Sequence, residues 1–511
     1  MLSPILDACA STVQLARHIR SGDFSAREVV EAHVRRIEAV NPGLNAVVLP
    51  LFERALAEAD AADARRARGE GLGVLHGVPV TIKENFDVAG TPTTAGVVAR
   101  RSHVALQDAA AVARLRDAGA IVVGKTNLAQ LMLFVESDNP VFGRTNNPWN
   151  RERSPGGSSG GEGAIVAAGG SAIGLGNDIG GSIRNPAHCC GICGIMPTPG
   201  RVPYEGAFDP NNREDGIKSV AGPLARSVDD LALALRVLAA DAIEPRTVEM
   251  QQLRVGFYVH NGIFAASPAL RRAVNEAQAA LAALGVAVEA FEPPRPSEAF
   301  RIYLAMLGSD GAALQGDALR GSKRDPRVNM LIGLTRFPNV LRPAAASIAS
   351  ALGQRRTATA IQALKRRSPG ERNLVAEMRA NYQRELLSAL DARRLDAIVC
   401  PPFALPAVTH GATANLLDAL SYTALFNLVG WPAGVVAATC VRQAEESDRP
   451  KSADIEEVTA RKVERGSAGL PIGVQIAARP FREDVVLALM GGLEEYFRGA
   501  SDYPKTPIDP R

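Results

Sequence analysis

The chain has 511 residues, of which 46% are hydrophobic and 22% are charged. This composition excludes an extended disordered protein, because there are enough apolar residues to bury a large core. The net charge of +3 arises from 57 basic and 54 acidic residues without a long run of one sign, which argues against a nucleic-acid partner.

The N-terminal sequence lacks a basic start followed by a long apolar run. We therefore expect neither a signal peptide nor an N-terminal membrane anchor. The six cysteines are too few and too clustered for a disulfide framework in a chain of this length. This cysteine usage indicates a reducing, cytoplasmic environment.

Helical and strand patterns alternate along the chain. Ser25-Ala26-Arg27-Glu28 has the form of a capping box and predicts a helix that lasts until Asn41. A second helical pattern runs from Asp108 to Gly119 and precedes a short apolar strand pattern at residues 120–123. Similar alternations occur at residues 227–238, 268–291 and 483–497. The pattern predicts an α/β fold.

Three regions need separate interpretation. Residues 320–372 combine apolar residues with many cations, which predicts a basic pair of surface helices, with peripheral membrane contact as the alternative. Residues 442–467 are strongly charged, and we expect a solvated surface insertion there. Residues 421–441 carry no charge and are long enough to span a bilayer, but Asn427, Pro432 and two glycines interrupt them, so we expect a buried core element.

Two clusters of glycine and serine dominate the functional analysis: SPGGSSGGEG at 154–163 and DIGGSIR at 178–184. Glycines around a serine let the backbone approach a reacting carbonyl and turn its amide hydrogens inward, as in an oxyanion hole. A flexible linker would not be followed by the apolar AIVAAGGSAIGLG, and a Walker loop would need GxxxxGK[ST]. GGSSG also matches the nucleophile elbow of α/β-hydrolases, a weaker alternative because the preceding NPWNRERSP cannot be a core strand.

Neither cluster contains a histidine, so the general base must be another residue. A buried lysine can lose its proton, and Lys83, which ends the apolar stretch 78–82, is the candidate. Taken alone, a lysine at the end of a strand is usually a surface residue. His188 lies near a single CxxC motif at 190–193 without a second pair, so we expect no metal site.

A series of motifs in chain order resembles the amidase signature family. They are VPVTIKEN at 78–85, GKTN at 124–127, NPWN at 147–150, SPGGSSGGEG at 154–163, DIGGSIRNPA at 178–187 and GICGIMPTPGRVP at 191–203. The resemblance implies one α/β/α domain over residues 1–511, with a large mixed β-sheet between helices, and no cofactor. It is weakest at about 290–395, where the resemblance implies a variable helical region that shapes the substrate pocket.

Carried over residue by residue, the family's Ser-Ser-Lys triad falls on Lys83, Ser158 and Ser182. Ser182 would be the nucleophile. Ser158, which the family holds beside a cis peptide, would pass protons between Ser182 and a neutral Lys83. The oxyanion hole would consist of the backbone amides of Ile179, Gly180, Gly181 and Ser182.

Further residues would support the triad. Asp178 and Arg184 would form a charge pair that shapes the nucleophile loop, and Ser159 would add a hydroxyl to the relay. Asn177 stands where many members have Thr or Ser, and Met196 where they often have Lys. These departures bear on the subgroup and not on the triad.

The resemblance implies a serine amidase that cleaves the C–N bond of a small-molecule amide through an acyl-enzyme. The motifs are similar to those of fatty acid amide hydrolases, which favours apolar acyl or aryl amides, with esters and carbamates (urethanes) as further substrates. Two alternatives stay open: the glutaminase subunit of a tRNA-dependent amidotransferase, and a non-catalytic binding module on the same fold. The sequence also leaves the oligomeric state open, a homodimer being one option.

Overall fold

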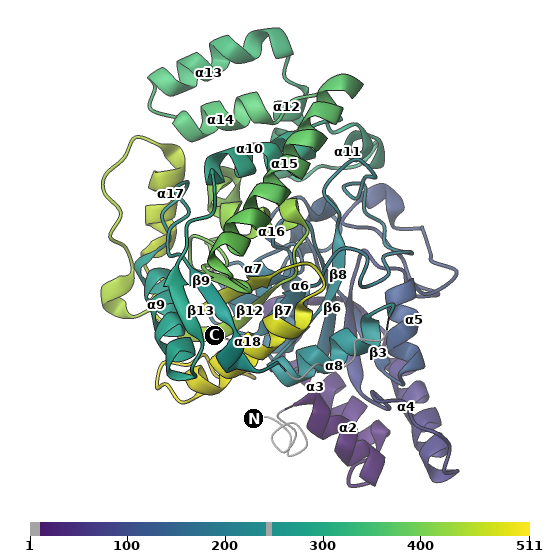
Figure 1. Cartoon of the computed structure of the whole chain (residues 1–511). Coiled ribbons are helices and arrows are strands. Elements are labelled where there is room, and N and C mark those ends of the chain that lie inside the picture. The colour runs from purple at the N-terminus through teal and green to yellow at the C-terminus, as the bar shows by residue number, and fades with distance from the viewer. Residues whose placement is uncertain (1–10, 242–247, 511) are drawn as a thin grey trace.

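The computed structural model of the protein describes residues 11–241 and 248–510, so Cys9 lies outside the described residues. An 11-stranded mixed β-sheet runs through the molecule and is enclosed by helices (Figure 1). This arrangement confirms the predicted α/β/α fold. The strands in spatial order are β1 (Val47–Pro50), β3 (Ile121–Thr126), β2 (Pro79–Lys83), β6 (Ile173–Asp178), β8 (Val220–Ala225), β7 (Cys193–Met196), β12 (Ala433–Cys440), β13 (Pro471–Ala478), β11 (Ala397–Cys400), β9 (Arg254–Phe257) and β10 (Ala287–Ala290).

The predicted capping box begins an early helix. Ser25 accepts a hydrogen bond from the backbone of Glu28, whose carboxylate accepts one from the backbone of Ser25, and α3 (Ala26–Leu44) follows. The helix continues past Asn41, where the sequence pattern predicted its end. It closes at Asn45, which adopts a left-handed conformation with φ of 52° and donates its N–H to the carbonyl of Asn41. The neighbouring helices are α2 (Thr12–Ser21), α4 (Phe52–Ala67) and α5 (Ala110–Asp117).

The two glycine-serine clusters lie between strands and helices in the centre of the molecule. The first runs into the first turn of α6 (Gly160–Ala167), and the second connects β6 to α7 (Arg184–Cys190). β2 pairs with β6 in parallel, with Ile82 opposite Leu175, so the carboxyl ends of both strands meet at one edge of the sheet. This edge holds Lys83 next to the second cluster.

The uncharged stretch at residues 421–441 is part of the core, as expected. It forms α16 (Ser421–Val429) and then β12, and nearly all of its side chains are buried. None of the helices in the described residues is both long and apolar enough to cross a bilayer. The other alternations of the sequence form α8 (Val228–Leu238), α9 (Pro268–Ala283) and α18 (Glu483–Arg498).

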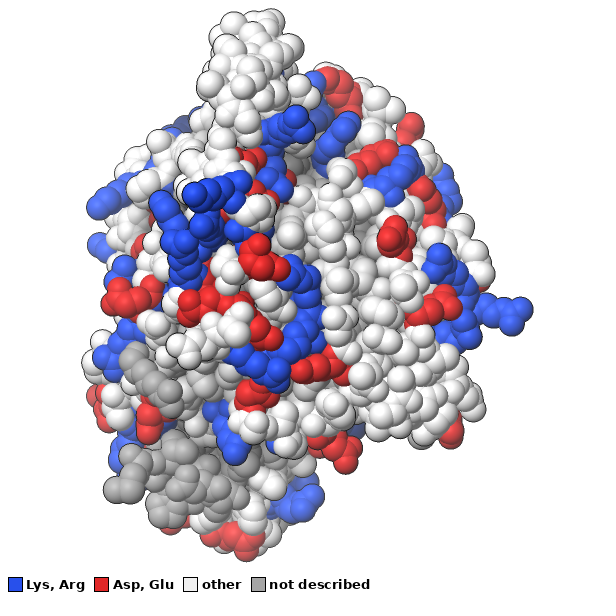
Figure 2. Space-filling view, turned by 90° about the vertical axis from the view of Figure 1, so that its left-hand side faces the viewer, with Lys and Arg blue, Asp and Glu red and all other residues white. Residues whose placement is uncertain are grey.

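A group of helices, which we call the cap, covers one end of the molecule (Figure 1). Figure 2 shows that its top is an uncharged protrusion, where Figure 1 places α13, while acidic and basic side chains are intermixed below it. Several large apolar side chains of the cap and its connecting segments are exposed, among them Val340 (85%), Leu352 (68%) and Ile348 (61%). The cap consists of α10 (Pro296–Leu307), α11 (Ala313–Ala318), α12 (Pro326–Arg336), α13 (Arg342–Ala351), α14 (Arg355–Ala363) and α15 (Pro369–Arg393).

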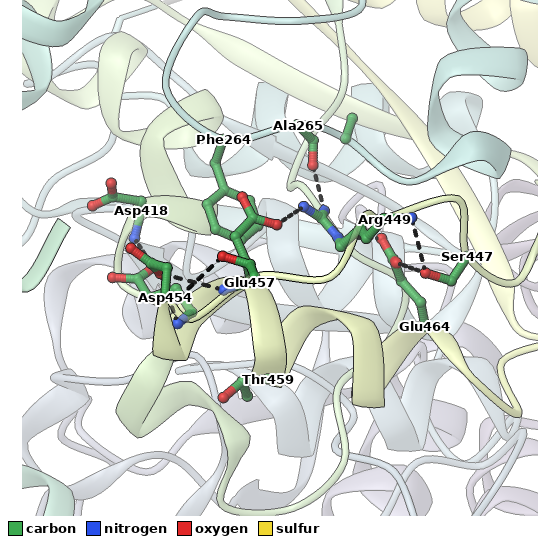
Figure 3. A network of polar contacts seen from close by, with 12 residues as sticks. Phe264, Ala265, Asp418, Ser447, Arg449, Asp454, Glu457, Thr459 and Glu464 are labelled. Atoms are coloured by element: carbon green, nitrogen blue, oxygen red, sulfur yellow. Dashed lines mark hydrogen bonds and ion pairs between the residues drawn. The ribbon is translucent and has the colours of Figure 1, made fainter. Parts of the chain in front are cut away.

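The charged segment at residues 442–467 is not solvated throughout, so the expectation of a solvated insertion was wrong in part. Its helix α17 (Ile455–Glu464) packs so that the Glu464 side chain is fully buried and Arg449 is 3% exposed. Arg449 contacts Glu464 and Glu457, each at 2.8 Å, and lies over the ring of Phe264 (Figure 3). These charges can be buried because each has an opposite partner, a pairing that sequence alone does not show.

Candidate active site

Lys83 is the last residue of β2 and is completely buried. Its Nζ atom lies 2.7 Å from Ser158 Oγ and 2.8 Å from Ser159 Oγ. Burial disfavours the charged ammonium more strongly than three nearby carboxylates favour it, and this lowers the pKa of Lys83 to about 7. A large share of the lysine is therefore neutral near pH 7. The three carboxylates are Asp209, Asp178 and Glu162.

Ser158 follows a cis peptide bond with Gly157. A side chain at Gly157 would meet the backbone nitrogen of Glu136 at 2.5 Å, so only glycine fits there. The carbonyl of Ser158 accepts a hydrogen bond from Ser137 Oγ at 3.1 Å. The backbone around Ser158 is therefore fixed from both sides.

Asp178 organises the second cluster. Its Oδ1 accepts the N–H of Gly181 at 2.7 Å, and its Oδ2 accepts the N–H of Ile183 at 3.0 Å. Arg184 forms an ion pair with Asp178 at 2.9 Å, and both side chains are fully buried. Burial opposes ionisation of Asp178, but the Arg184 guanidinium holds its pKa at about 2. The carboxylate thus stays charged and holds the loop.

Ser182 lies in this loop and lines a mostly apolar cavity. The structure joins it to the first cluster through the backbone, since the N–H of Ser159 donates to the carbonyl of Ser182 at 3.1 Å. Among the described residues the Ser182 hydroxyl makes no hydrogen bond, so it does not contact Ser158 in this conformation. Catalytic hydrogen bonds often form only once substrate is bound.

One of the four amides expected to form the oxyanion hole already has an acceptor in this structure. The amide of Gly181 already donates to Asp178, so it is not free to bind an oxyanion in this structure. Within the described part of the chain, the amides of Ile179, Gly180 and Ser182 have no backbone or side-chain acceptor. These three amides are the available donors of the loop.

Two acidic residues of the site were not predicted from the sequence. Glu162 is fully buried in α6 and accepts hydrogen bonds from Thr81 (2.5 Å) and Thr126 (2.8 Å). Burial raises the pKa of Glu162 to about 8, so it is mostly protonated at neutral pH. Its place in the GGEG sequence before an apolar helix was the available sequence indication. Asp209 lies in the loop after β7, where nothing in the sequence pointed to the site.

A predominantly apolar cavity opens beside Ser182. It contains about 1170 Å³ of empty space, including the solvent at its open mouth. Part of its wall comes from the loop before the first cluster, part from the cap and part from residues 416–420. The apolar lining includes Met132, Leu133, Phe134, Leu304, Leu307, Leu331, Ile332, Leu364, Leu416 and Leu420.

The cysteine and histidine residues near α7 form no metal centre in the described residues. Both ring nitrogens of His188 have backbone partners, the carbonyl of Leu405 at 3.0 Å and the N–H of Gly473 at 3.0 Å. Burial raises the pKa values of the thiols of Cys189, Cys190 and Cys193. These residues therefore pack in the core as neutral side chains.

A buried lysine beside paired serines, at the edge of a mixed sheet, places the protein among serine-dependent amide hydrolases. The family model described as Amidase matches residues 28–487, so the chain belongs to the amidase signature family and is a hydrolase of C–N bonds. Both the family resemblance and the likeness to fatty acid amide hydrolases are confirmed.

The similarity to known proteins extends over much of the chain. Fatty-acid amide hydrolase 1 of Sus scrofa is 34% identical over 499 residues, which cover 94% of this chain and 84% of the relative. A solved structure of a fatty acid amide hydrolase has a TM-score of 0.85 and 25% identity, and the match covers 98% of this chain and 87% of that chain. A glutamyl-tRNA(Gln) amidotransferase component of Carboxydothermus hydrogenoformans is 35% identical over 331 residues, 62% of this chain and 67% of the relative.

Proposed function

We propose that the protein hydrolyses amides with long apolar acyl groups through an acyl-enzyme on Ser182. The observation that carries this proposal is the apolar cavity, which reaches from Ser182 into the cap. A cavity with this lining stabilises an alkyl chain by about 0.8 kcal/mol for each buried methylene group. The similarity to fatty acid amide hydrolases supports the same substrate class.

The proposed reaction uses Lys83 as the base. Ser182 turns toward Ser158 when substrate binds, and its Oγ attacks the carbonyl carbon of the amide. The proton of Ser182 passes to Ser158 Oγ, while Ser158 gives its own proton to the neutral amine of Lys83. The tetrahedral oxyanion is held by the amides of Ile179, Gly180 and Ser182.

The proton then returns to the leaving group. Lys83 gives it back to Ser158, and Ser158 protonates the amide nitrogen, so that the C–N bond breaks and a neutral amine leaves. A water molecule attacks the resulting acyl ester and regenerates Ser182 by the same relay. Esters and carbamates enter the same sequence, because each has a carbonyl and a leaving group, and we include them as substrates in the proposal.

A panel of acyl p-nitroanilides from acetyl to decanoyl, with one carbamate and free glutamine, tests the proposal. We expect kcat/KM to rise with chain length, and turnover to vanish in Ser182→Ala but not in the control Ser102→Ala, whose serine is exposed. Equal rates in Ser182→Ala and wild type would overturn the assignment of the nucleophile. Turnover of glutamine alone would support the glutaminase subunit of an amidotransferase, and binding without any turnover would support a non-catalytic module.

We also propose that the cap touches membrane surfaces. The exposed Val340, Ile348 and Leu352 lie in a segment with many cations, a combination that favours the interface of an anionic bilayer. The protein should sediment with vesicles that contain phosphatidylserine, and the triple change of these residues to serine should abolish this. A control change of the exposed Leu106 to serine should have no effect, since that residue lies outside the cap. Equal sedimentation of all three proteins would refute this role of the cap.

A further inference from the structure

Asp209 lies in the loop between β7 and β8, where neutral hydrogen-bond donors hold its carboxylate. Its carboxylate accepts hydrogen bonds from Tyr204 OH at 2.8 Å, from Ser219 Oγ at 2.6 Å and from the backbone and side-chain N–H groups of Asn211, both at 2.9 Å. In the part of the chain that the structure describes, no Lys, Arg or His nitrogen lies within 4.0 Å of it. Every donor is neutral, so the hydrogen bonds stabilise the carboxylate without cancelling its charge.

A short chain of contacts joins this carboxylate to the catalytic lysine. Asn177 Nδ2 donates to Tyr204 OH at 2.7 Å and lies 3.4 Å from Asp209 Oδ2. The backbone carbonyl of Asn177 accepts from Ser159 Oγ at 3.3 Å, and Ser159 Oγ contacts Lys83. Asp209 is thus connected to the relay through the position at which this chain departs from many members of the family.

The other acidic groups near Lys83 are either paired with a cation or protonated. Asp178 is neutralised by Arg184, and Glu162 is mostly protonated because it is buried. Glu84, the next residue in the chain, and the buried Lys125 on β3 attract each other. Asp209 also exerts the largest attraction of the three carboxylates that raise the pKa of Lys83 against the effect of burial.

We propose that Asp209 is a positioning residue that sets the proton affinity of Lys83 through its uncompensated charge and the Tyr204–Asn177–Ser159 contacts. Without this charge the buried amine would bind a proton too weakly to take one from Ser158. With it, the lysine stays partly neutral at rest and accepts a proton during attack. The role rests on the proposed function, because it assumes that neutral Lys83 is the base for Ser182.

The test is the pH dependence, from pH 5 to 9, of the phosphonylation of Ser182 by a fluorophosphonate, in which Ser182 Oγ bonds to phosphorus and fluoride leaves. Labelling needs neutral Lys83, so its rate rises with pH toward a plateau. Asp209→Asn removes the negative charge, which lowers the pKa of Lys83 and moves the midpoint to lower pH. We expect a shift of about 0.5 to 1 pH unit, so that labelling at the acidic end, relative to the plateau, becomes about three to ten times faster.

Ser219→Ala is the matched control, because it removes one hydrogen bond to Asp209 but keeps the charge. Its midpoint should stay at the wild-type value even if its plateau falls. A lower plateau with an unchanged midpoint in Asp209→Asn would show a purely structural role and overturn the proposal. If Asp209→Asn does not fold, Asp209→Ser provides the same charge removal. Failure of wild-type Ser182 to react at any pH would instead refute the proposed function.

Discussion

The N–H of Ser159 donates to the carbonyl of Ser182 at 3.1 Å and so ties the two glycine-serine clusters together. Ser159 also contacts Lys83 through its hydroxyl, so one residue links the lysine to the loop of the nucleophile. The two clusters are needed together because Ser158 and Ser182 come from different loops, while Lys83 ends β2. Their relative position depends on this backbone contact and on the Asp178–Arg184 pair behind it.

Activity should rise with pH through a midpoint near 7. The pKa of Lys83 is about 7, and only the neutral amine can accept a proton from Ser158. Lys83→Ala should lower kcat by about a thousandfold and abolish this pH dependence. The measurement is kcat/KM for a decanoyl anilide between pH 5 and 9.

Histidine variants test whether a histidine, rather than Lys83, is the general base. His33 and His188 are buried and have pKa values of about 4, too low for a midpoint near 7. His260 is exposed and lies outside the site, so His260→Gln should leave the midpoint unchanged. A midpoint that survives in Lys83→Ala but moves in His260→Gln would assign the base to histidine.

Replacing Lys83 should also stabilise the fold. The pKa of Lys83 is lower in the folded protein than its ordinary value of 10.5, so the unfolded chain binds the proton more readily between pH 7 and 10.5. Stability therefore rises with pH over this range and is reduced at pH 7 and below. Lys83→Met removes this cost, and its Tm at pH 7 should exceed that of wild type by about 3 °C or more. The exposed Lys451→Met is the control and should leave Tm within about 1 °C. A lower Tm for Lys83→Met would contradict the argument.

Breaking the buried ion pair should be strongly destabilising. Arg184→Met leaves Asp178 as a buried carboxylate without a counter-charge, at a cost of about 3 to 5 kcal/mol in the free energy of unfolding. The exposed pair Arg320–Asp317 provides the control, where Arg320→Met should cost less than about 1 kcal/mol. Urea unfolding measures both. The double change Asp178→Asn and Arg184→Met should be more stable than Arg184→Met alone, and the idea fails if it is not.

Gly180 is packed against Tyr303, which allows a rescue experiment. A Cβ atom at Gly180 would collide with the Tyr303 hydroxyl, while the carbonyl of Gly180 is held by Thr423 Oγ1 at 2.7 Å. Gly180→Ala should therefore displace the oxyanion donors and lower kcat about a hundredfold. Adding Tyr303→Phe removes the colliding oxygen and should restore kcat by about tenfold. If Tyr303→Phe gives no recovery, the loss has another cause.

The sequence places the candidate site residues in contiguous motifs. Lys83, Ser158 and Asp178 each belong to a short motif that carries the family resemblance, and the strand and helix beside each motif have strong local patterns. The capping box at Ser25 and Glu28 depends only on neighbours in sequence, so it was predictable as well.

Features that depend on distant neighbours were not predictable. The burial of Arg449 and Glu464 requires their mutual contact, and a charged sequence gives no indication of that pairing. The commitment of the Gly181 amide to Asp178 depends on the conformation of the loop, and the contacts of Asp209 depend on how residues 204–219 fold over β6. Each of these features results from tertiary packing. Such contacts leave no periodic pattern and no motif in a single sequence.

The cap should determine the length of the acyl group. Ile332 lies on α12, at the end of the molecule away from α7 (Figure 1), and lines the cavity that contains Ser182. Ile332→Trp should fill the far part of the cavity and exclude the end of a long chain. Each excluded methylene forgoes about 0.8 kcal/mol, so loss of three of them lowers kcat/KM for the decanoyl anilide by about fiftyfold.

A substrate with a short acyl group provides the control for Ile332→Trp. The acetyl anilide has no alkyl chain that could extend toward Ile332, so its kcat/KM in Ile332→Trp should stay within about twofold of wild type. Val340→Trp adds the same ring to an exposed position of the cap and should leave the whole chain-length series unchanged. If Ile332→Trp instead lowered acetyl and decanoyl turnover equally, the cavity beyond Ser182 would not be the acyl site, and the alkyl chain would have to bind elsewhere.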